Sequence, residues 1–138
     1  MGKLEETYIS GEPVPKGRPR FTRSGRTYTP KKTLDHERAI REAWESGNHE
    51  PFGDSVPLEM IIEFHMKMPD SWSNKKRFRM NLSPCTKHTD LDNLTKTVQD
   101  ALNGVAFADD SQIVSLKANK LWCDKGETYV IIRELDSE

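Results

Sequence analysis

One stretch of the sequence, residues 57 to 69, alternates apolar and polar side chains in the manner of a half-buried β-strand. Every second residue is large and apolar, and most of those between are charged or polar, with Ile61 as the apolar exception. Successive side chains of a strand point to opposite faces of a sheet, so this pattern predicts one buried face and one face near water. The buried face comprises Leu58, Met60, Ile62, Phe64, Met66 and Met68.

The remaining pattern predicts the order βαβ, then two helices, then two strands. A short strand opens the chain at residues 7 to 10, before a run of prolines. Thr29 and Pro30 suit the N-cap and first position of a helix that ends near Gly47. A short basic helix follows at residues 74 to 80, and strands at 112–123 and 127–135 flank a turn at 124–126. The whole chain, residues 1–138, is thus expected to form a single α+β domain with a mixed β-sheet flanked by helices.

Basic residues gather in two blocks, although the net charge is only −1. Residues 13 to 34 contain seven Lys or Arg and no acid, and residues 74 to 80 form a second basic run. Such blocks in a near-neutral protein favour a positive face for a polyanion, and the alternative is a solvated, partly disordered arm at about residues 13–32. The candidate DNA contacts are Lys16, Arg18, Arg20, Arg23, Arg26, Lys75, Lys76 and Arg77.

Cysteine use and hydropathy point to the cytoplasm. Cys85 and Cys123 have no CxxC spacing, so we expect reduced thiols rather than a disulfide framework or a tetrahedral zinc site. The sequence shows neither a signal peptide nor an apolar run of about 18 residues. We therefore expect a cytoplasmic protein without a membrane partner.

Residues 91 to 103 predict an amphipathic helix. Its apolar positions fall within one stripe about 100° wide, which suits packing on the sheet. Asp92, Lys96 and Asp100 follow at steps of four on the other side, and Gly104 is placed to end the helix. The apolar stripe consists of Leu91, Leu94, Val98, Ala101 and Leu102.

Acidic pairs stand at both ends of this helix: Asp90 at the expected N-cap position with Asp92 in the first turn, and Asp109 and Asp110 after the helix. Helix capping and the macrodipole account for acids at an N-terminus, and a solvated turn would account for the second pair. Four acids and Lys96 around one short element instead suggest a metal site. Oxygen donors without thiolates suit Mg²⁺ or Mn²⁺.

Such a site is suited to hydrolysis at phosphorus. A carboxylate-bound metal activates water, and Lys96 is placed either to stabilise phosphate charge or to form a surface ion pair with Asp92. An acidic cluster repels a polyanion unless metal is bound, whereas separate basic blocks hold the backbone at other phosphates. Together these features suggest a phosphodiesterase that acts on nucleic acid.

The motifs resemble one known family. "DLDNLTK" at residues 90–96, "DALNGVAFADDSQIV" at 100–114 and the later Lys120, with "KGRPR" and "YTP" upstream, are similar to the RusA family of Holliday-junction resolvases from about residue 8 to 133. The resemblance implies a RusA-like fold and a homodimeric, Mg²⁺-dependent endonuclease that nicks opposed strands of a four-way junction, often encoded by phages or prophages. It implies catalytic roles for Asp90, Asp92, Lys96 and Asp110, with Asp109 as an immediate neighbour. The candidate metal ligands from the residues themselves are Asp90, Asp92, Asp109 and Asp110.

A dimer also suits the substrate, because a four-way junction has near two-fold symmetry. The first strand and residues 113–122 are the candidate interface strands. The alternatives are a related metal nuclease acting on flaps, forks or RNA, and a non-catalytic junction-binding protein. His88, close to Asp90, is either a site residue or a polar loop residue. Aromatic residues in or beside the basic blocks either stack on unpaired bases or pack within the protein or its dimer; they are Tyr28, Trp72 and Phe78.

Overall fold

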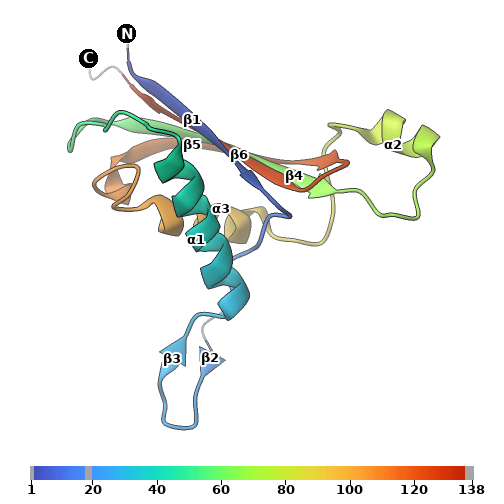
Figure 1. Ribbon diagram of the computed structural model, residues 1–138, viewed down its shortest axis with the longest axis horizontal. Coiled ribbons are helices and arrows are strands. Elements are labelled where there is room, and N and C mark those ends of the chain that lie inside the picture. The colour runs from blue at the N-terminus through green and yellow to red at the C-terminus, as the bar shows by residue number, and fades with distance from the viewer. Residues whose placement is uncertain (1, 18–19, 136–138) are drawn as a thin grey trace.

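A mixed four-stranded sheet forms the centre of the computed structural model, which describes residues 2–17 and 20–135 (Figure 1). The strands run in the order β1-β6-β4-β5, with β4 and β5 parallel and the other neighbours antiparallel. This arrangement confirms the predicted α+β class and the mixed sheet. The bounds are β1 Leu4–Ser10, β4 Leu58–Lys67, β5 Ile113–Cys123 and β6 Glu127–Glu134.

Helices α1 (Lys31–Ser46) and α3 (Leu91–Leu102) cover one face of this sheet and enclose the core (Figure 1). The predicted apolar face of β4 is fully buried, with its members between 0% and 1% exposed. Burying one such side chain stabilises the fold by about 1.5–3 kcal/mol. From α3 the buried stripe consists of Leu94, Val98, Ala101 and Leu102, with Leu91 packed at its edge.

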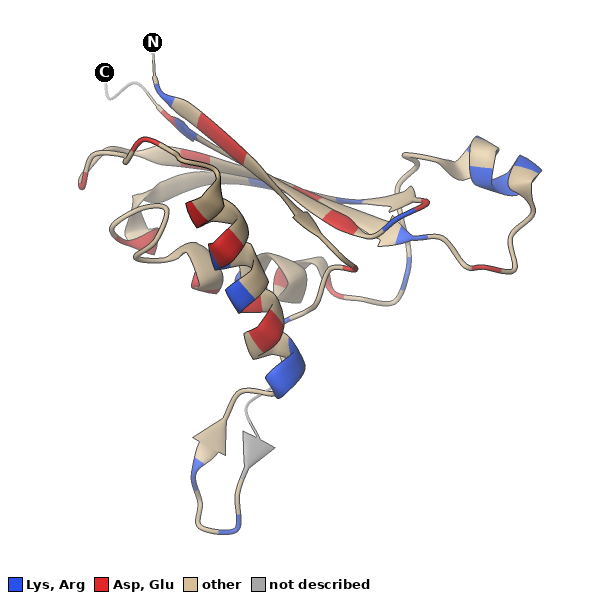
Figure 2. Cartoon of the chain, viewed as in Figure 1, with Lys and Arg blue, Asp and Glu red and all other residues tan. Residues whose placement is uncertain are grey.

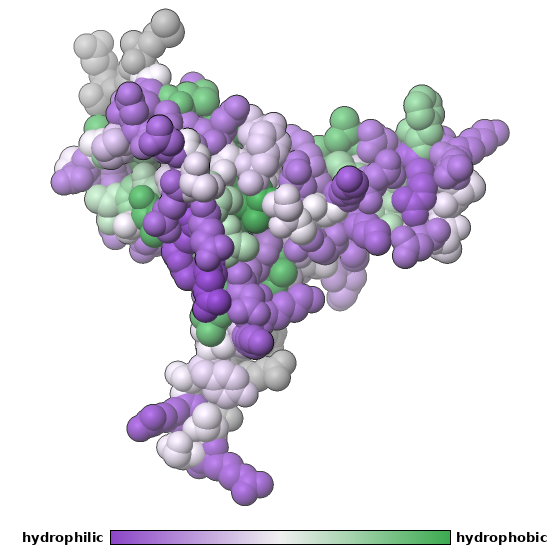
Figure 3. All heavy atoms as spheres, in the orientation of Figure 1, coloured by the Kyte–Doolittle hydropathy of each residue, from purple (hydrophilic) through white to green (hydrophobic). Residues whose placement is uncertain are grey.

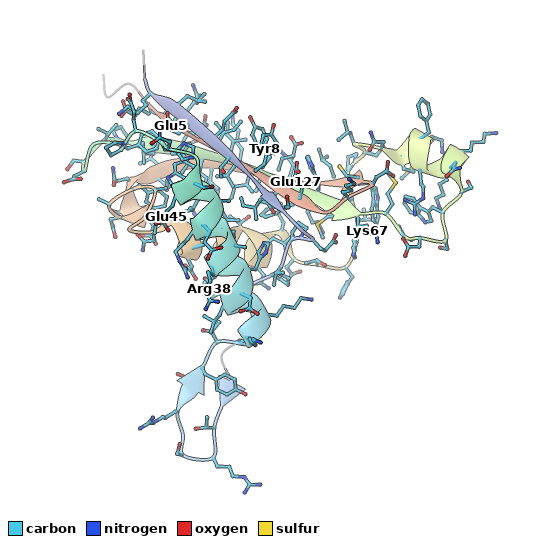
Figure 4. The ribbon with its side chains drawn as sticks, viewed as in Figure 1. Glu5, Tyr8, Arg38, Glu45, Lys67 and Glu127 are labelled. Atoms are coloured by element: carbon cyan, nitrogen blue, oxygen red, sulfur yellow. The ribbon has the colours of Figure 1, made fainter. Side chains whose placement is uncertain are left out.

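Helix α1 begins one residue later than predicted. Pro30 is the N-cap, with extended backbone, and its carbonyl accepts hydrogen bonds from the Thr33 and Leu34 amides. Thr29 therefore lies outside the helix and caps nothing in it. The outer face of α1 is polar, and Figure 4 shows Arg38 and Glu45 pointing away from the sheet.

Two basic segments project from the body in different directions (Figures 1 and 2). One is a hairpin of β2 (Arg20–Phe21) and β3 (Thr27–Tyr28), within the basic arm expected at about residues 13–32. Its turn uses Gly25 at φ +82°, a conformation open to glycine, and the Thr22 amide donates to the Arg26 carbonyl. The other is helix α2, Asn74–Met80, which confirms the predicted short basic helix.

The second face of the sheet lies opposite the helices and carries a buried carboxylate. Glu59 is only 4% exposed and accepts hydrogen bonds from Ser115 Oγ at 2.7 Å and Arg133 Nε at 2.6 Å. The hydrogen bond from Ser115 has the largest effect, followed by the one from Arg133. Together they outweigh desolvation and lower the pKa of Glu59 below its ordinary value. On the same face, further along β6, Tyr8 and Tyr129 stack with ring centroids 4.3 Å apart.

Both cysteines are buried and free, which confirms the expectation of unpaired thiols. Burial, aided by nearby acids, raises the pKa of the Cys123 thiol to about 11, so it is protonated at neutral pH. No helix in the described parts of the chain combines the length and apolar character needed to cross a membrane.

Candidate active site

Asp92 and Lys96 lie one turn apart on the solvent side of α3, where they border a pocket between this helix and the edge strand β5. Asp110 reaches the same pocket from the 3₁₀ turn η1, Asp110–Gln112, which directly precedes β5. The pocket is open to solvent and has a volume of about 490 Å³. Its lining is Leu91, Asp92, Thr95, Lys96, Gln99, Asp100, Asp110, Leu116 and Ala118.

The ammonium group of Lys96 is available at this pocket. Lys96 is exposed, and within the described chain it forms no ion pair with Asp92 or Asp100, although both lie four residues away. Asp100 instead pairs with Lys16, at 3.0 Å between Nζ and Oδ2. The pocket therefore presents a carboxylate from each side and a cation that is not committed to either.

Asp90 occupies the N-cap position of α3, as predicted, but its side chain does not cap the helix. Its carboxylate is exposed, with the Asn93 amide nitrogen 3.4 Å from Oδ2 as its recorded contact. Asp90 is also absent from the lining of the Asp92 pocket. Capping therefore does not explain why an acid stands at this position.

Asp109 has a local role that Asp110 lacks. Its carboxylate accepts hydrogen bonds from the backbone amide and the hydroxyl of Ser111 and so caps the η1 turn. These bonds lower the pKa of Asp109. Asp110 is exposed and lies at the pocket. Of the two adjacent acids, one is thus engaged with its own turn and the other faces the pocket.

Gln112 fixes this turn to the rest of the protein. Its buried side-chain oxygen accepts hydrogen bonds from the Ala108 and Asp109 amides at 3.0 and 3.2 Å. Its side-chain nitrogen donates to the carbonyls of Gly53 and Val56 at 2.8 and 3.0 Å. Four bonds from one amide therefore hold the segment that carries Asp110. Gln112 belongs to the motif at residues 100–114, but the sequence does not reveal that its side chain binds the carbonyls of Gly53 and Val56, more than 50 residues away.

Lys120 has a similar role at the other end of the site. Its Nζ donates to the carbonyls of Lys87 and Thr89, at 2.8 and 2.6 Å, and so holds the segment leading into Asp90. One feature of the sequence could have indicated this role. Lys120 lies two residues from both Ala118 and Trp122 in β5, so all three side chains share the helix-covered face of the sheet. A lysine on such a face needs polar partners. His88 lies exposed in the same segment.

Some of the basic candidates are already engaged by acids or carbonyls, some are exposed, and some lie outside the described residues. Lys16 is committed, because its Nζ lies 3.1 Å from Glu37 and 3.0 Å from Asp100. Burial alone would lower its pKa, but the hydrogen bonds that Lys16 donates to these acids raise the pKa of Lys16 overall. It thereby ties the base of the hairpin to α1 and α3. Arg18 and the side chain of Arg20 lie outside the described residues.

Arg23 and Arg26 are exposed in the hairpin, and Lys75 is exposed on α2. Lys76 lies over the Trp72 ring, 4.3 Å from its centroid. Arg77 is engaged in structure: its guanidinium donates to the carbonyls of Pro69 and Trp72 and to Asp124. The hairpin and α2 therefore both present free cations, but not every basic residue in them is free.

The donor chemistry fits a hard divalent cation, although the four predicted ligands are not gathered together. Across residues 2–17 and 20–135, no three acidic, histidine or cysteine side chains stand close enough to hold a metal. Asp92 and Asp110 nevertheless offer carboxylate oxygens to one open pocket. Mg²⁺ is commonly held by one or two carboxylates, with water and substrate phosphates completing its shell. This pocket meets that requirement.

Comparison with known proteins gives the family. The model of the family described as "Endodeoxyribonuclease RusA" matches residues 10–133. An uncharacterised protein, YqaN of Bacillus subtilis, is 34% identical over 94% of this chain and 95% of its own length. A crossover junction endodeoxyribonuclease of Lactococcus phage r1t is 34% identical over 62% of this chain and 61% of its own length. Because the family match spans nearly all of the sequence, including the Asp92 pocket and both basic segments, the chain belongs to the RusA family of Holliday-junction resolvases.

Proposed function

We propose that this protein is a divalent-metal-dependent endonuclease that resolves four-way DNA junctions by paired, symmetric nicks. The observation that carries the proposal is the meeting of Asp92, Lys96 and Asp110 at one open pocket, from two elements separated in sequence. Nucleases of this family generally depend on a divalent metal. Mg²⁺ is the proposed cofactor, with Mn²⁺ as a possible substitute.

Each residue of the site has a distinct proposed task. Asp92 and Asp110 would hold the metal from opposite sides of the pocket, with Asp90 or Asp109 as further ligands. When bound, the metal would supply an activated water and polarise the scissile phosphate. Lys96 would donate hydrogen bonds to a phosphate oxygen and stabilise charge that develops there. Gln112 and Lys120 would keep the two acid-bearing segments in place.

The hairpin and α2 would hold DNA away from the cutting position. Arg23 and Arg26 are exposed in the hairpin, and Lys75 on α2, so each can reach a phosphate without breaking a recorded ion pair. Such contacts are independent of sequence and sensitive to salt. Arg18, Arg20 and Lys76 remain proposed contacts, while Lys16 and Arg77 would contribute mainly by fixing the two segments.

A homodimer is part of the proposal, because two cuts related by two-fold symmetry need two sites related by the same axis. The two candidate interface strands are the two edges of the observed sheet, β1 and β5. Residues 82–85 already pair with the last part of β5, through hydrogen bonds to Lys120 and Trp122. Strand β1 and the first part of β5 are therefore the edges left for a second copy.

The test is incubation of the purified protein with a synthetic four-way junction and with linear duplexes of the same arm sequences. Separate reactions contain Mg²⁺, Mn²⁺ or a chelator. We expect paired nicks on opposed strands, only in the junction and only with metal. Asp92→Asn should abolish cutting and retain binding, whereas Asp35→Asn, at an exposed acid on α1, should behave as wild type.

Two outcomes would replace this proposal with a rival. Metal-dependent cutting of flaps, forks or RNA in preference to the junction would keep the site and change the substrate. Binding of the junction without cutting under every metal would favour a non-catalytic binding protein. Unchanged cutting by Asp92→Asn would contradict the assignment of the site itself.

A further inference from the structure

The most exposed large apolar side chain of the described chain is on the basic helix α2. Phe78 is 90% exposed, while the apolar residues of the core are almost completely buried. Figure 3 shows hydrophobic atoms at the surface of this projecting segment. Exposing a whole aromatic ring to water is unfavourable, so covering this ring with a partner would stabilise the complex.

The helix that carries Phe78 is firmly attached to the body. Arg77 donates to the Pro69 carbonyl at 2.7 Å and to the Trp72 carbonyl at 3.2 Å, and it reaches Asp124 in the β5–β6 turn at 3.4 Å. Trp72 packs against Trp122 of β5, with ring centroids 4.9 Å apart. Because the helix is held at several points, Phe78 can bind a partner with a small loss of conformational entropy.

The surroundings of Phe78 carry positive charge. Lys75 and Arg79 are exposed on the same helix, and residues 74 to 80 contain no acid, as the blue colouring of α2 in Figure 2 shows. The nearby Asp124 is engaged by Arg77. An aromatic ring between free cations favours a nucleic acid over an apolar protein surface, because bases stack on rings and phosphates pair with Lys and Arg.

A pocket of about 260 Å³ lies beside the ring. It is lined by Asn74, Arg77, Phe78, Asn81 and Asp124. Asn74 and Asn81 lie four residues before and three after Phe78, so a helical path brings all three to one side. Side-chain amides offer both donors and acceptors, as the edge of a base requires.

We propose that Phe78 and this pocket bind a single unpaired nucleobase at the branch point of the DNA, while Lys75 and Arg79 contact the flanking phosphates. This proposal rests on the proposed junction substrate and adds a base-recognition site separate from the Asp92 pocket. It makes α2 a sensor of unpaired bases rather than a general basic contact.

The experiment measures binding by the full chain carrying Asp92→Asn, so that the DNA stays intact. The probes are a four-way junction, a duplex with one bulged base, and the fully paired duplex of the same length. Phe78→Ala should weaken binding of the junction and the bulged duplex by roughly 5- to 100-fold, and of the paired duplex by less than about twofold. Phe78→Trp should restore binding, and Phe78→Leu should not.

Leu34→Ala is the matched control, since it removes an exposed apolar side chain, 46% exposed, from helix α1. It should leave all three affinities unchanged. Equal losses on paired and bulged DNA, or full rescue by Phe78→Leu, would overturn the proposal. So would unaltered DNA binding combined with a changed oligomeric state in sedimentation, which would make Phe78 a protein contact. Failure of wild-type protein to cut junctions would refute the proposed activity but leave these binding differences intact.

Discussion

Asp109 and Asp110 are neighbours in the sequence, yet their carboxylates have different surroundings. Asp109 caps its own turn through Ser111, while Asp110 lies at the pocket shared with Asp92 and Lys96. Asp110→Asn should therefore lower the rate of junction cutting by about 100-fold or more. Even residues that only hydrogen-bond to a metal ligand change activity 10- to 100-fold when mutated. Asp109→Asn should lower it much less, because asparagine caps a helix as well as aspartate does.

The measurement is the single-turnover cutting rate with saturating metal, alongside thermal unfolding of both variants. The two variants remove the same charge one residue apart, so each controls for the other. A large loss in Asp109→Asn with little change in Asp110→Asn would reverse the assignment.

Gln112 is a positioning residue with an effect on both stability and activity. Gln112→Ala removes four part-buried hydrogen bonds, from two backbone amides and to two backbone carbonyls, which should lower the free energy of unfolding by about 1–2 kcal/mol. Gln112→Glu keeps the two acceptor bonds to the turn and loses the two donated bonds. If the turn position governs activity, Glu should retain more cutting than Ala at a temperature where both are folded. Full activity and native stability in Gln112→Ala would contradict this role.

At the scale of elements, Glu59 links β4, β5 and β6 on the open face of the sheet. Because the folded state lowers its pKa below the ordinary value of 4.5, the carboxylate contributes stability above that pH. The contribution is lost as pH falls through the folded pKa. Glu59→Gln should thus be destabilising by about 1–2 kcal/mol at pH 7, with Arg133 partly exposed, and the difference should shrink as the pH falls from 7 towards 3.

Urea unfolding of wild type and variant across this pH range measures the difference. Glu45→Gln, on the outer face of α1 (Figure 4), is the control and should show little effect at any pH. A difference that stays constant with pH would mean that Glu59 acts through packing rather than charge.

The elements themselves were largely predictable, and their tertiary connections were not. The alternation of β4 and the stripe of α3 depend on local periodicity, so the sequence reveals which faces are buried. Other contacts depend on how the elements pack. Lys16 pairs with Asp100, 84 residues away, and the Gln112 side chain donates a hydrogen bond to the Gly53 carbonyl. The hairpin strands have two residues each, too short for a periodic signal. The acids of the site were predicted from composition and motif, and the family resemblance already favoured Asp110, whereas the hydrogen bonds that engage Asp109 with its own turn required the fold.

At the scale of the whole molecule, DNA affinity should reside in the projecting segments and depend strongly on salt. Arg23 and Arg26 are exposed in the hairpin, whereas Lys16 at its base is already paired with two acids. Each phosphate contact contributes about 0.9 to the slope of log affinity against log salt concentration. Removing Arg23 and Arg26 together should therefore reduce the magnitude of this slope by roughly 1.8.

The slope is measured by titrating a four-way junction at several salt concentrations with the Asp92→Asn chain and its Arg23→Ala, Arg26→Ala derivative. Arg38→Ala removes the same type of charge from the outer face of α1 and should leave the slope unchanged (Figure 4). Lys16→Ala should instead lower thermal stability, because it leaves the buried Glu37 without its cation. If Arg38→Ala reduced the slope as much as the double variant, the charge of the whole protein, and not the hairpin, would govern binding. A slope reduced only by the hairpin substitutions would mean that the hairpin binds phosphates away from the acidic pocket. At the pocket itself, the carboxylates repel the negatively charged DNA backbone and oppose binding.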